Sequence, residues 1–221
     1  MILGIVVTGV LLWFLISGNL FKSAEITKKP AILYVNQGNG IVNASNFGAM
    51  LILAKSHGFN TVFFQVYRAG TLLFNTSDLH SFVANTHSEG LQIFFAIYLT
   101  GPSQEIPVAI YDLGEDGISL DMSTLPTTSQ GSLLDTLQAG YHAGRTAITT
   151  TNVNLTLRPD LVVLETYGAG NQKFIKHGIV ASVGVFATAS KADYDQEFLY
   201  ALNNSDGVMV FDYAGLVKSG Y

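Results

Sequence analysis

Three carboxylates stand near the ends of short apolar runs in the sequence, namely Asp121, Glu165 and Asp212. Hydrolysis of a glycosidic bond needs two carboxyl groups, one acting as acid and the other as nucleophile or base. The carboxyl ends of parallel strands in a barrel meet at one rim, so acids at these ends face a common cavity. Acids that share a cavity raise one another's pKa, which keeps a general acid protonated near neutral pH. We predict these three as catalytic residues, with Asp121 and Glu165 as the leading pair.

Other polar and aromatic side chains fall at the same predicted strand ends and would suit a sugar. Asn, Gln and Arg supply directional hydrogen bonds to hydroxyl groups, and a tyrosine ring stacks on the apolar face of a pyranose. For any one of them the ordinary alternative is a strand end that is polar because it meets water. The predicted substrate-binding residues are Asn36, Gln65, Tyr67, Arg68, Tyr98, Tyr167 and Tyr213.

The stretch "GEDGISLDMS" holds two aspartates that we expect to differ in role. Five positions separate Asp116 from Asp121, and the apolar residues between them predict a strand. A strand of that length puts the two carboxylates at opposite ends of a barrel. Asp116, together with Gly117, is predicted to shape the turn into the strand. Asp121 is predicted to lie at the rim where sites form.

Several other chemistries are disfavoured by what the sequence lacks. The chain has no cysteine, so disulfides, thiolate chemistry and Cys-ligated zinc are excluded. The five histidines show no metal-ligand spacing, and neither a phosphate-binding Gly-rich loop nor a Gly-x-Ser-x-Gly elbow occurs. We therefore expect no metal and no cofactor. The net charge of −5, without a basic block, makes nucleic acid an unsuitable partner.

The chain alternates apolar runs with helix-like segments, which is typical of a parallel α/β fold. Eight strands would close a compact (β/α)8 TIM barrel, and about 190 residues require several helices to be short. A doubly wound open sheet is the rival architecture. The expected helices are 43–59, 76–90, 132–144, 171–178 and 191–205, with a mostly irregular segment at 101–116. The expected strands are 31–36, 60–67, 91–99, 117–121, 146–153, 161–168, 179–187 and 207–215.

The N-terminal segment differs from the rest of the chain. Residues 2–21 carry no charge, and this length is enough to cross a hydrocarbon core as a helix. No Lys or Arg precedes the run, so an uncleaved anchor is favoured over a signal peptide. We predict a membrane anchor or signal segment at 1–21, a linker at 22–30 and one barrel domain at 31–221.

The side of the membrane on which the barrel lies is predicted from two opposing signals. Lysines follow the apolar run, and positive-inside bias would keep the barrel cytoplasmic. Four Asn-x-Ser/Thr acceptors favour the outside. We predict an extracellular barrel, as in a cell-envelope protein, with acceptors at Asn43, Asn75, Asn154 and Asn203.

Four segments of the sequence resemble parts of a known protein family. "AKSHGFNTVFFQVYRAGTLLF", "HSEGLQIFFAIYL", "EDGISLDM" and "NNSDGVMVFDYAGL" resemble successive parts of the glycosyl-hydrolase-like GHL10 family. The resemblance spans most of residues 31–215. It implies a TIM barrel that acts on a polysaccharide, with Asp121 at the position of the family acid and looser matches at Gln65 and Arg68.

The chain also departs from that family. Ser119 stands where the family usually has His, Met122 where it has Tyr, and Ser123 occupies the position of the catalytic Glu of chitinase-like enzymes. The only tryptophan, Trp13, lies in the predicted anchor. Two hypotheses therefore stand, an active glycoside hydrolase and a non-catalytic glycan-binding or structural envelope protein with a degenerate barrel.

Overall fold

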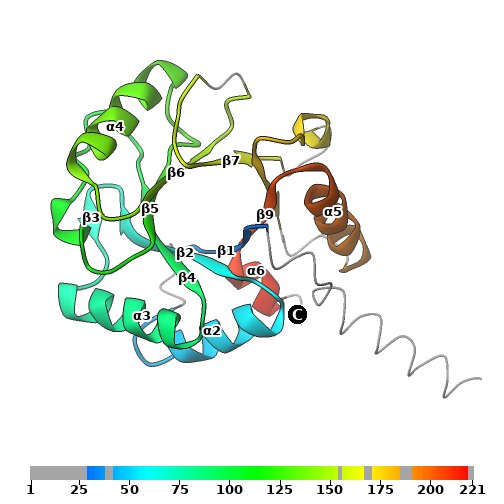
Figure 1. The fold of residues 1–221 in the computed structure, drawn as a ribbon, viewed down its shortest axis with the longest axis horizontal. Helices are drawn as coiled ribbons and strands as arrows, with labels where there is room; N and C mark the ends of the chain where they lie inside the picture. Colours follow the sequence, from blue (N-terminus) through cyan, green and yellow to red (C-terminus); the bar gives the residue numbers. More distant parts are fainter. Residues whose placement is uncertain (1–28, 38–41, 154–155, 167–170, 185–190, 219–221) are drawn as a thin grey trace, which may run out of the picture.

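A computed structural model describes residues 29–37, 42–153, 156–166, 171–184 and 191–218. Eight parallel strands in this part of the chain form a closed ring, because the first strand pairs with both the second and the last (Figure 1). A short antiparallel strand, β3 (Thr71–Leu72), forms a hairpin with the second barrel strand. The closure confirms the predicted barrel and excludes the open sheet. The barrel strands are β1 (Ala31–Val35), β2 (Thr61–Arg68), β4 (Gln92–Tyr98), β5 (Gly117–Asp121), β6 (Arg145–Thr150), β7 (Leu161–Glu165), β8 (Val180–Gly184) and β9 (Gly207–Phe211).

The helices lie outside the ring and cover only part of it (Figure 1). The connection from β6 to β7 contains no helix in its described residues, and the one from β7 to β8 contains a single turn of 3-10 helix. The helices are α2 (Phe47–Ser56), α3 (Thr76–Ser88), α4 (Thr127–Gly140), α5 (Lys191–Asn204) and α6 (Tyr213–Lys218), with 3-10 turns η2 (Val108–Ile110) and η3 (Asn171–Phe174). Some connections are thus short, as predicted: α6 has 6 residues and η3 has 4, whereas α3, α4 and α5 have 13, 14 and 14.

Several predicted boundaries differ from the structure. The helix predicted at 43–59 spans Phe47–Ser56, and the strands predicted at 146–153 and 161–168 end at Thr150 and Glu165. The last strand ends at Phe211 rather than 215, and α6 begins two residues later. The helix predicted at 132–144 begins at Thr127, and the one predicted at 171–178 is only the 3-10 turn η3. In the described part of the chain no helix is both long and apolar enough to cross a membrane. The predicted anchor at 2–21 lies outside the described residues.

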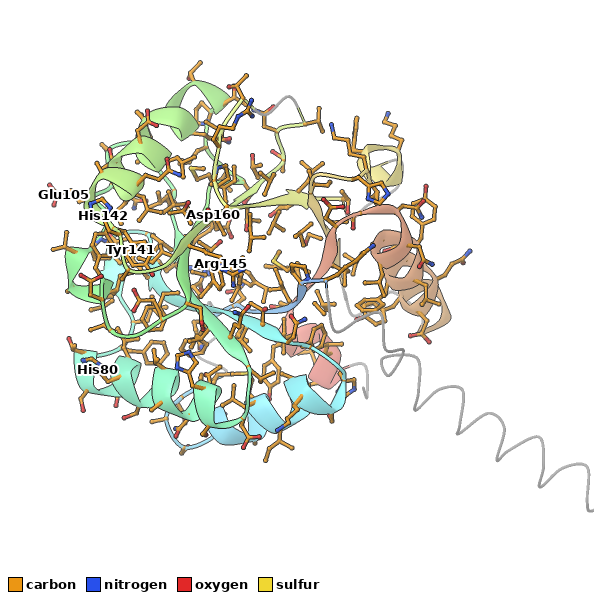
Figure 2. The ribbon with its side chains drawn as sticks, in the orientation of Figure 1. His80, Glu105, Tyr141, His142, Arg145 and Asp160 are labelled. Carbon is orange, nitrogen blue, oxygen red and sulfur yellow. The ribbon has the colours of Figure 1, made fainter. Side chains whose placement is uncertain are left out.

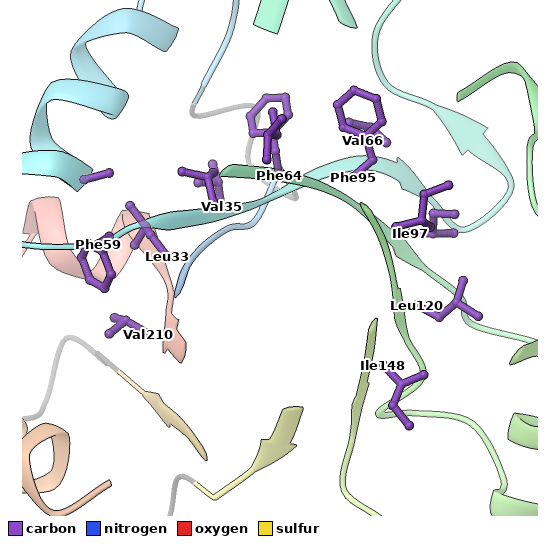
Figure 3. Packing of buried hydrophobic residues seen from close by; sticks show 14 of the residues in the cluster. Leu33, Val35, Phe59, Phe64, Val66, Phe95, Ile97, Leu120, Ile148 and Val210 are labelled. Carbon is purple, nitrogen blue, oxygen red and sulfur yellow. The ribbon is translucent and has the colours of Figure 1, made fainter. Parts of the chain in front are cut away.

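Side chains alternate between two cores because each strand is buried on both faces. Leu33 and Val35 of β1 point outward into a large core beneath the helices, where Phe64, Phe95 and Leu120 also pack (Figure 3). The inward-facing residues form a second core inside the barrel. This inner core comprises Ile32, Tyr34, Phe63, Phe94, Ala96, Ala147, Val163, Val180 and Met209.

The amino-terminal end of the barrel is filled by aromatic side chains. The Phe63 and Phe94 rings lie 5.0 Å apart, and the Arg145 guanidinium lies 4.9 Å from the Phe94 ring centre, near the middle of Figure 2. Gly117 sits beside this cluster, and a Cβ atom there would overlap the Phe94 ring and the Arg145 carbonyl. These side chains fill the interior of the barrel at this end, and a pocket of about 180 Å³ beside them is lined by Lys29, Pro30, Asn60, Thr61, Gln92, Arg145 and Leu161.

A repeated hydrogen-bond motif fixes the starts of alternate strands. Asn60, Asp116, Asp160 and Asp206 each stand one residue before β2, β5, β7 and β9, and each uses a side-chain oxygen to accept a backbone N–H near the start of the preceding barrel strand. The bonds come from Ala31 at 3.0 Å, Ile93 at 2.8 Å, Thr146 at 2.7 Å and Gly178 at 2.8 Å. Asp116 also bonds His87 Nε2 at 2.9 Å. The structure therefore gives Asp116 the structural role predicted for it.

We expect Asp116→Ala to lower the free energy of unfolding by about 1–3 kcal/mol, because it leaves the Ile93 N–H without its acceptor. Asp116→Asn is the matched control, since its amide oxygen can still accept that bond. Urea unfolding of the full-length chain measures both. Equal losses in the two variants would contradict the proposed role of the acceptor oxygen.

Candidate active site

A pocket of about 190 Å³ opens at the carboxyl-terminal mouth of the barrel. Residues from six barrel strands or the positions just after them line it, as expected where parallel strands end together. Six of the predicted site residues meet there, including both members of the leading carboxylate pair. The lining residues are Tyr34, Asn36, Gln65, Arg68, Tyr98, Asp121, Ser123, Glu165 and Phe211.

Three predicted residues lie away from this pocket. The Tyr67 side chain packs in the outer core, and its hydroxyl donates to the Glu105 carbonyl at 3.1 Å. Asp212 directly precedes α6, and its Oδ1 accepts the Gly215 N–H at 3.0 Å. Tyr213 packs against the outer core from α6. A fourth predicted residue, Tyr167, lies outside the described residues.

Asp121 is almost fully enclosed, with 4% of its surface exposed, and hydroxyl groups engage both of its carboxyl oxygens. The Ser123 hydroxyl donates to Oδ1 at 2.8 Å, and the Tyr34 hydroxyl donates to Oδ2 at 3.1 Å. Tyr34 in turn accepts a bond from Gln65 Nε2 at 3.5 Å, and Gln65 Oε1 accepts the Gln37 N–H at 2.9 Å. This chain of bonds fixes the Asp121 carboxyl against the pocket wall.

Burial raises the pKa of Asp121, while the bonds from Ser123 and Tyr34 and the charge of Arg68 oppose that rise. The sequence correctly predicted a raised pKa, but the main cause is loss of water rather than neighbouring acids. A carboxyl with a raised pKa keeps its proton to a higher pH than a free carboxyl does, which suits proton donation. Burial likewise raises the pKa of Asp212, although that residue caps a helix outside the pocket.

Glu165 ends β7 and is half-buried, so its carboxylate has more contact with solvent than that of Asp121. Its charge contributes to the raised pKa of Tyr34, whose main cause is burial. Tyr34 therefore lies within electrostatic reach of both acids. The pocket thus contains one enclosed carboxyl and one more exposed carboxyl, a difference that separates an acid from a base or nucleophile.

On the β5–β8 side, the barrel interior carries small polar side chains. The hydroxyls of Ser119, Thr149 and Ser182 are buried there with no protein hydrogen-bond partner among the described residues. Thr149 stands beside Asp121 in the strand register, and Ser182 stands beside Glu165. These side chains are at most 1% exposed and do not line the pocket, so their hydroxyls make the barrel interior polar beside both acids and can bind buried water.

Sequence reasoning missed the roles of Tyr34 and Phe211. Their rings pack at 5.2 Å between centres, and both line the pocket. The available signal was alternation, because Ile32, Tyr34 and Asn36 fall on one face of β1 and its continuation. That pattern places Tyr34 inside the barrel but does not identify Asp121 as its partner.

No group of three or more His, Asp or Glu side chains suited to a metal ion occurs among the residues that the structure describes. Figure 2 shows His80 and His142 at the periphery of the molecule, away from the barrel axis.

Tyr34→Phe is expected to raise the pKa of Asp121 further, because it removes a hydrogen bond that stabilises the ionised carboxylate. A carboxyl-carbon NMR titration of the aspartate-labelled full-length chain measures this directly. Tyr98→Phe is the matched control, since Tyr98 lines the same pocket without bonding Asp121. An Asp121 pKa that stays the same or falls in Tyr34→Phe would contradict the assignment.

Comparisons with known proteins inform the fold. A scan against protein-family models and a search of curated proteins find no match. Among solved structures, the chain is similar to a GH113 beta-1,4-mannanase, with a TM-score of 0.59 and 9% sequence identity. The similarity covers 84% of this chain and 88% of the mannanase chain. At this identity the likeness shows the fold alone, a (β/α)8 barrel.

Proposed function

We propose that the barrel-mouth pocket hydrolyses a glycosidic bond in a polysaccharide or other glycan. The observation that carries the proposal is that Asp121 and Glu165 line one pocket at the mouth of a closed barrel. Two carboxyl groups in a shared pocket are what glycoside hydrolysis requires. The GH113 mannanase-like fold and the resemblance to the GHL10 family at Gln65 and Asp121 support the same function.

The two carboxyl groups take different roles in this mechanism. Asp121, the enclosed acid, donates its proton to the glycosidic oxygen as the bond to the leaving sugar breaks. Glu165, the more exposed carboxylate, attacks the anomeric carbon or removes a proton from the attacking water. Tyr34 and Ser123 hold the Asp121 carboxyl in place through both of its oxygens.

A screen of glycans with the full-length chain in ¹⁸O-labelled water tests this proposal. Hydrolysis places the label at the new reducing end, and mass spectrometry detects it. We expect labelled products from at least one glycan. Labelled product formed at the same rate by the double variant Asp121→Asn/Glu165→Gln would contradict the assignment of the pocket.

The second candidate function is non-catalytic glycan binding. The pocket volume of about 190 Å³ favours it, because it is smaller than most small-molecule sites, which span roughly 300–1,000 Å³. Ser123 also stands at the position that holds the catalytic Glu in chitinase-like enzymes. Tight glycan binding without any labelled product would support this candidate over the hydrolase.

We further propose that residues 2–21 anchor the barrel on the outer side of a membrane. The uncharged run supports an anchor, and Asn43, Asn75 and Asn203 are exposed, as glycosylation acceptors must be. Carbonate extraction and protease accessibility of intact cells test this proposal. Recovery of the chain in the carbonate-soluble fraction would contradict the anchor, and protection from external protease would contradict the orientation.

A further inference from the structure

A bulge in β2 directs an arginine into the pocket. The register between β2 and β4 shifts between Gln65 and Tyr67, so that one extra residue is accommodated. Val66 and Tyr67 both pack in the outer core, which leaves Arg68 as the next inward-facing residue. Bulges are frequent beside active sites, where they re-aim a side chain. Here the extra residue returns the guanidinium to the inner face of the barrel.

The Arg68 guanidinium uses only one of its N–H groups in a hydrogen bond to another described residue. Its Nη1 donates to Asn36 Oδ1 at 3.3 Å, and its central carbon lies 5.1 Å from the centre of the Tyr98 ring. Among the described residues no carboxylate forms an ion pair with it. A guanidinium carries five N–H donors and keeps its charge in proteins. Asn36 and Tyr98 therefore orient the group without neutralising it.

Asp121 interacts with the charge of Arg68 but forms no ion pair with it. Asp121 has each oxygen bonded to a hydroxyl, Oδ1 to Ser123 and Oδ2 to Tyr34. Two acids in a small pocket repel an incoming anion, and a doubly charged phosphate is repelled more strongly than a singly charged carboxylate. The planar fork of arginine also matches a carboxylate in a bidentate geometry.

We infer that Arg68 determines specificity for a glycan unit that carries a carboxylate, namely a hexuronic acid. This inference rests on the proposed function, because it names the substrate class of the same pocket. The sugar carboxylate would bind the free N–H groups of Arg68. The sugar hydroxyls would bind polar groups that line the pocket, such as Asn36 and Gln65.

A pair of oligosaccharides that differ only at C6 tests the inference. We choose a β-1,4-linked mannuronic acid hexamer and the neutral β-1,4-linked mannose hexamer, and measure binding to the full-length chain by calorimetry. All proteins carry Asp121→Asn to prevent hydrolysis. The acidic hexamer is expected to bind about 10- to 100-fold more tightly than the neutral one, as charge-assisted hydrogen bonds allow.

Three variants in that background locate the source of the preference. Arg68→Gln is expected to weaken binding of the acidic hexamer far more than binding of the neutral one, so that the preference is lost. Arg68→Lys, which keeps the charge but loses the fork, is expected to retain part of the preference. Arg158→Gln, which removes an exposed arginine outside the pocket, is the charge-matched control and is expected to keep it. Circular dichroism confirms that each variant is folded.

Two outcomes would overturn the inference. Equal or tighter binding of the neutral hexamer, or an unchanged preference in Arg68→Gln, would remove the role of Arg68 and leave the proposed glycan pocket standing. Failure of the parent protein to bind either hexamer would also overturn it. The hydrolysis screen judges the proposed function separately, because that screen uses many glycans and does not depend on Arg68.

Discussion

Replacing Asp121 with asparagine is expected to lower the rate of glycan hydrolysis by about 10²- to 10⁴-fold, the contribution typical of a positioned acid or base. Asparagine keeps the shape of the side chain but has no acidic proton. Its oxygen can still accept from Ser123, and the Tyr34 hydroxyl can turn to accept from the new amide. The initial rate of reducing-end release at saturating glycan measures the effect. An unchanged rate would contradict the assignment of Asp121 as the acid.

Stability measurements separate this loss of activity from misfolding. Burial raises the folded-state pKa of Asp121 above its unfolded value, so the native state binds the proton more tightly. The stability contribution of this group is present below the unfolded pKa and decreases as pH rises through the folded pKa. The asparagine variant lacks this decrease. Its unfolding temperature at neutral pH is therefore expected to equal or exceed that of the wild type.

Glu165→Gln is expected to lower the same rate by about 10²- to 10⁴-fold, because glutamine neither attacks an anomeric carbon nor removes a proton from water. Glu165→Ala distinguishes this role from simple positioning. Alanine leaves a gap at the half-buried end of β7, in which formate can replace the missing carboxylate. Formate should therefore accelerate the alanine variant but not the glutamine variant, whose side chain fills the gap.

A matched control for both acids is Asp212→Asn. Asp212 also has a raised pKa, but it caps α6 and does not line the pocket. Asparagine is as good a cap as aspartate, so both stability and hydrolysis are expected to stay close to wild type. A loss of activity as large as that of Asp121→Asn would indicate that the pocket assignment is incomplete.

The strands were predictable because parallel strands buried on both faces read as continuous apolar runs. Helix starts were harder to predict. The strand 207–215 was predicted too long because "YAGL" continues the apolar run, although the chain has already turned into α6. The start of α4 was missed because polar and β-branched residues, with Gly131 among them, occupy its first turns.

Part of the pocket lining was predictable because the carboxyl ends of parallel strands meet at one rim. This rule placed Asp121, Glu165 and Arg68 together, and all three line one pocket. Strict alternation failed at Tyr67, because the bulge puts two successive residues on the outer face. The Tyr34–Asp121 bond joins residues 87 positions apart across the barrel. This hydrogen bond depends on the radius of the barrel and on the lengths of the two side chains. A local sequence pattern does not give these dimensions, so the bond could not be predicted.

The central claim is that Asp121 and Glu165 act as a pair on one glycosidic bond. A double-mutant cycle of hydrolysis rates for wild type, Asp121→Asn, Glu165→Gln and the combined variant tests it most directly, because residues that act as a unit are strongly non-additive. We predict that the combined variant is no slower than the slower single variant. Losses that simply multiply would show that the two carboxyl groups act independently, and would contradict the claim.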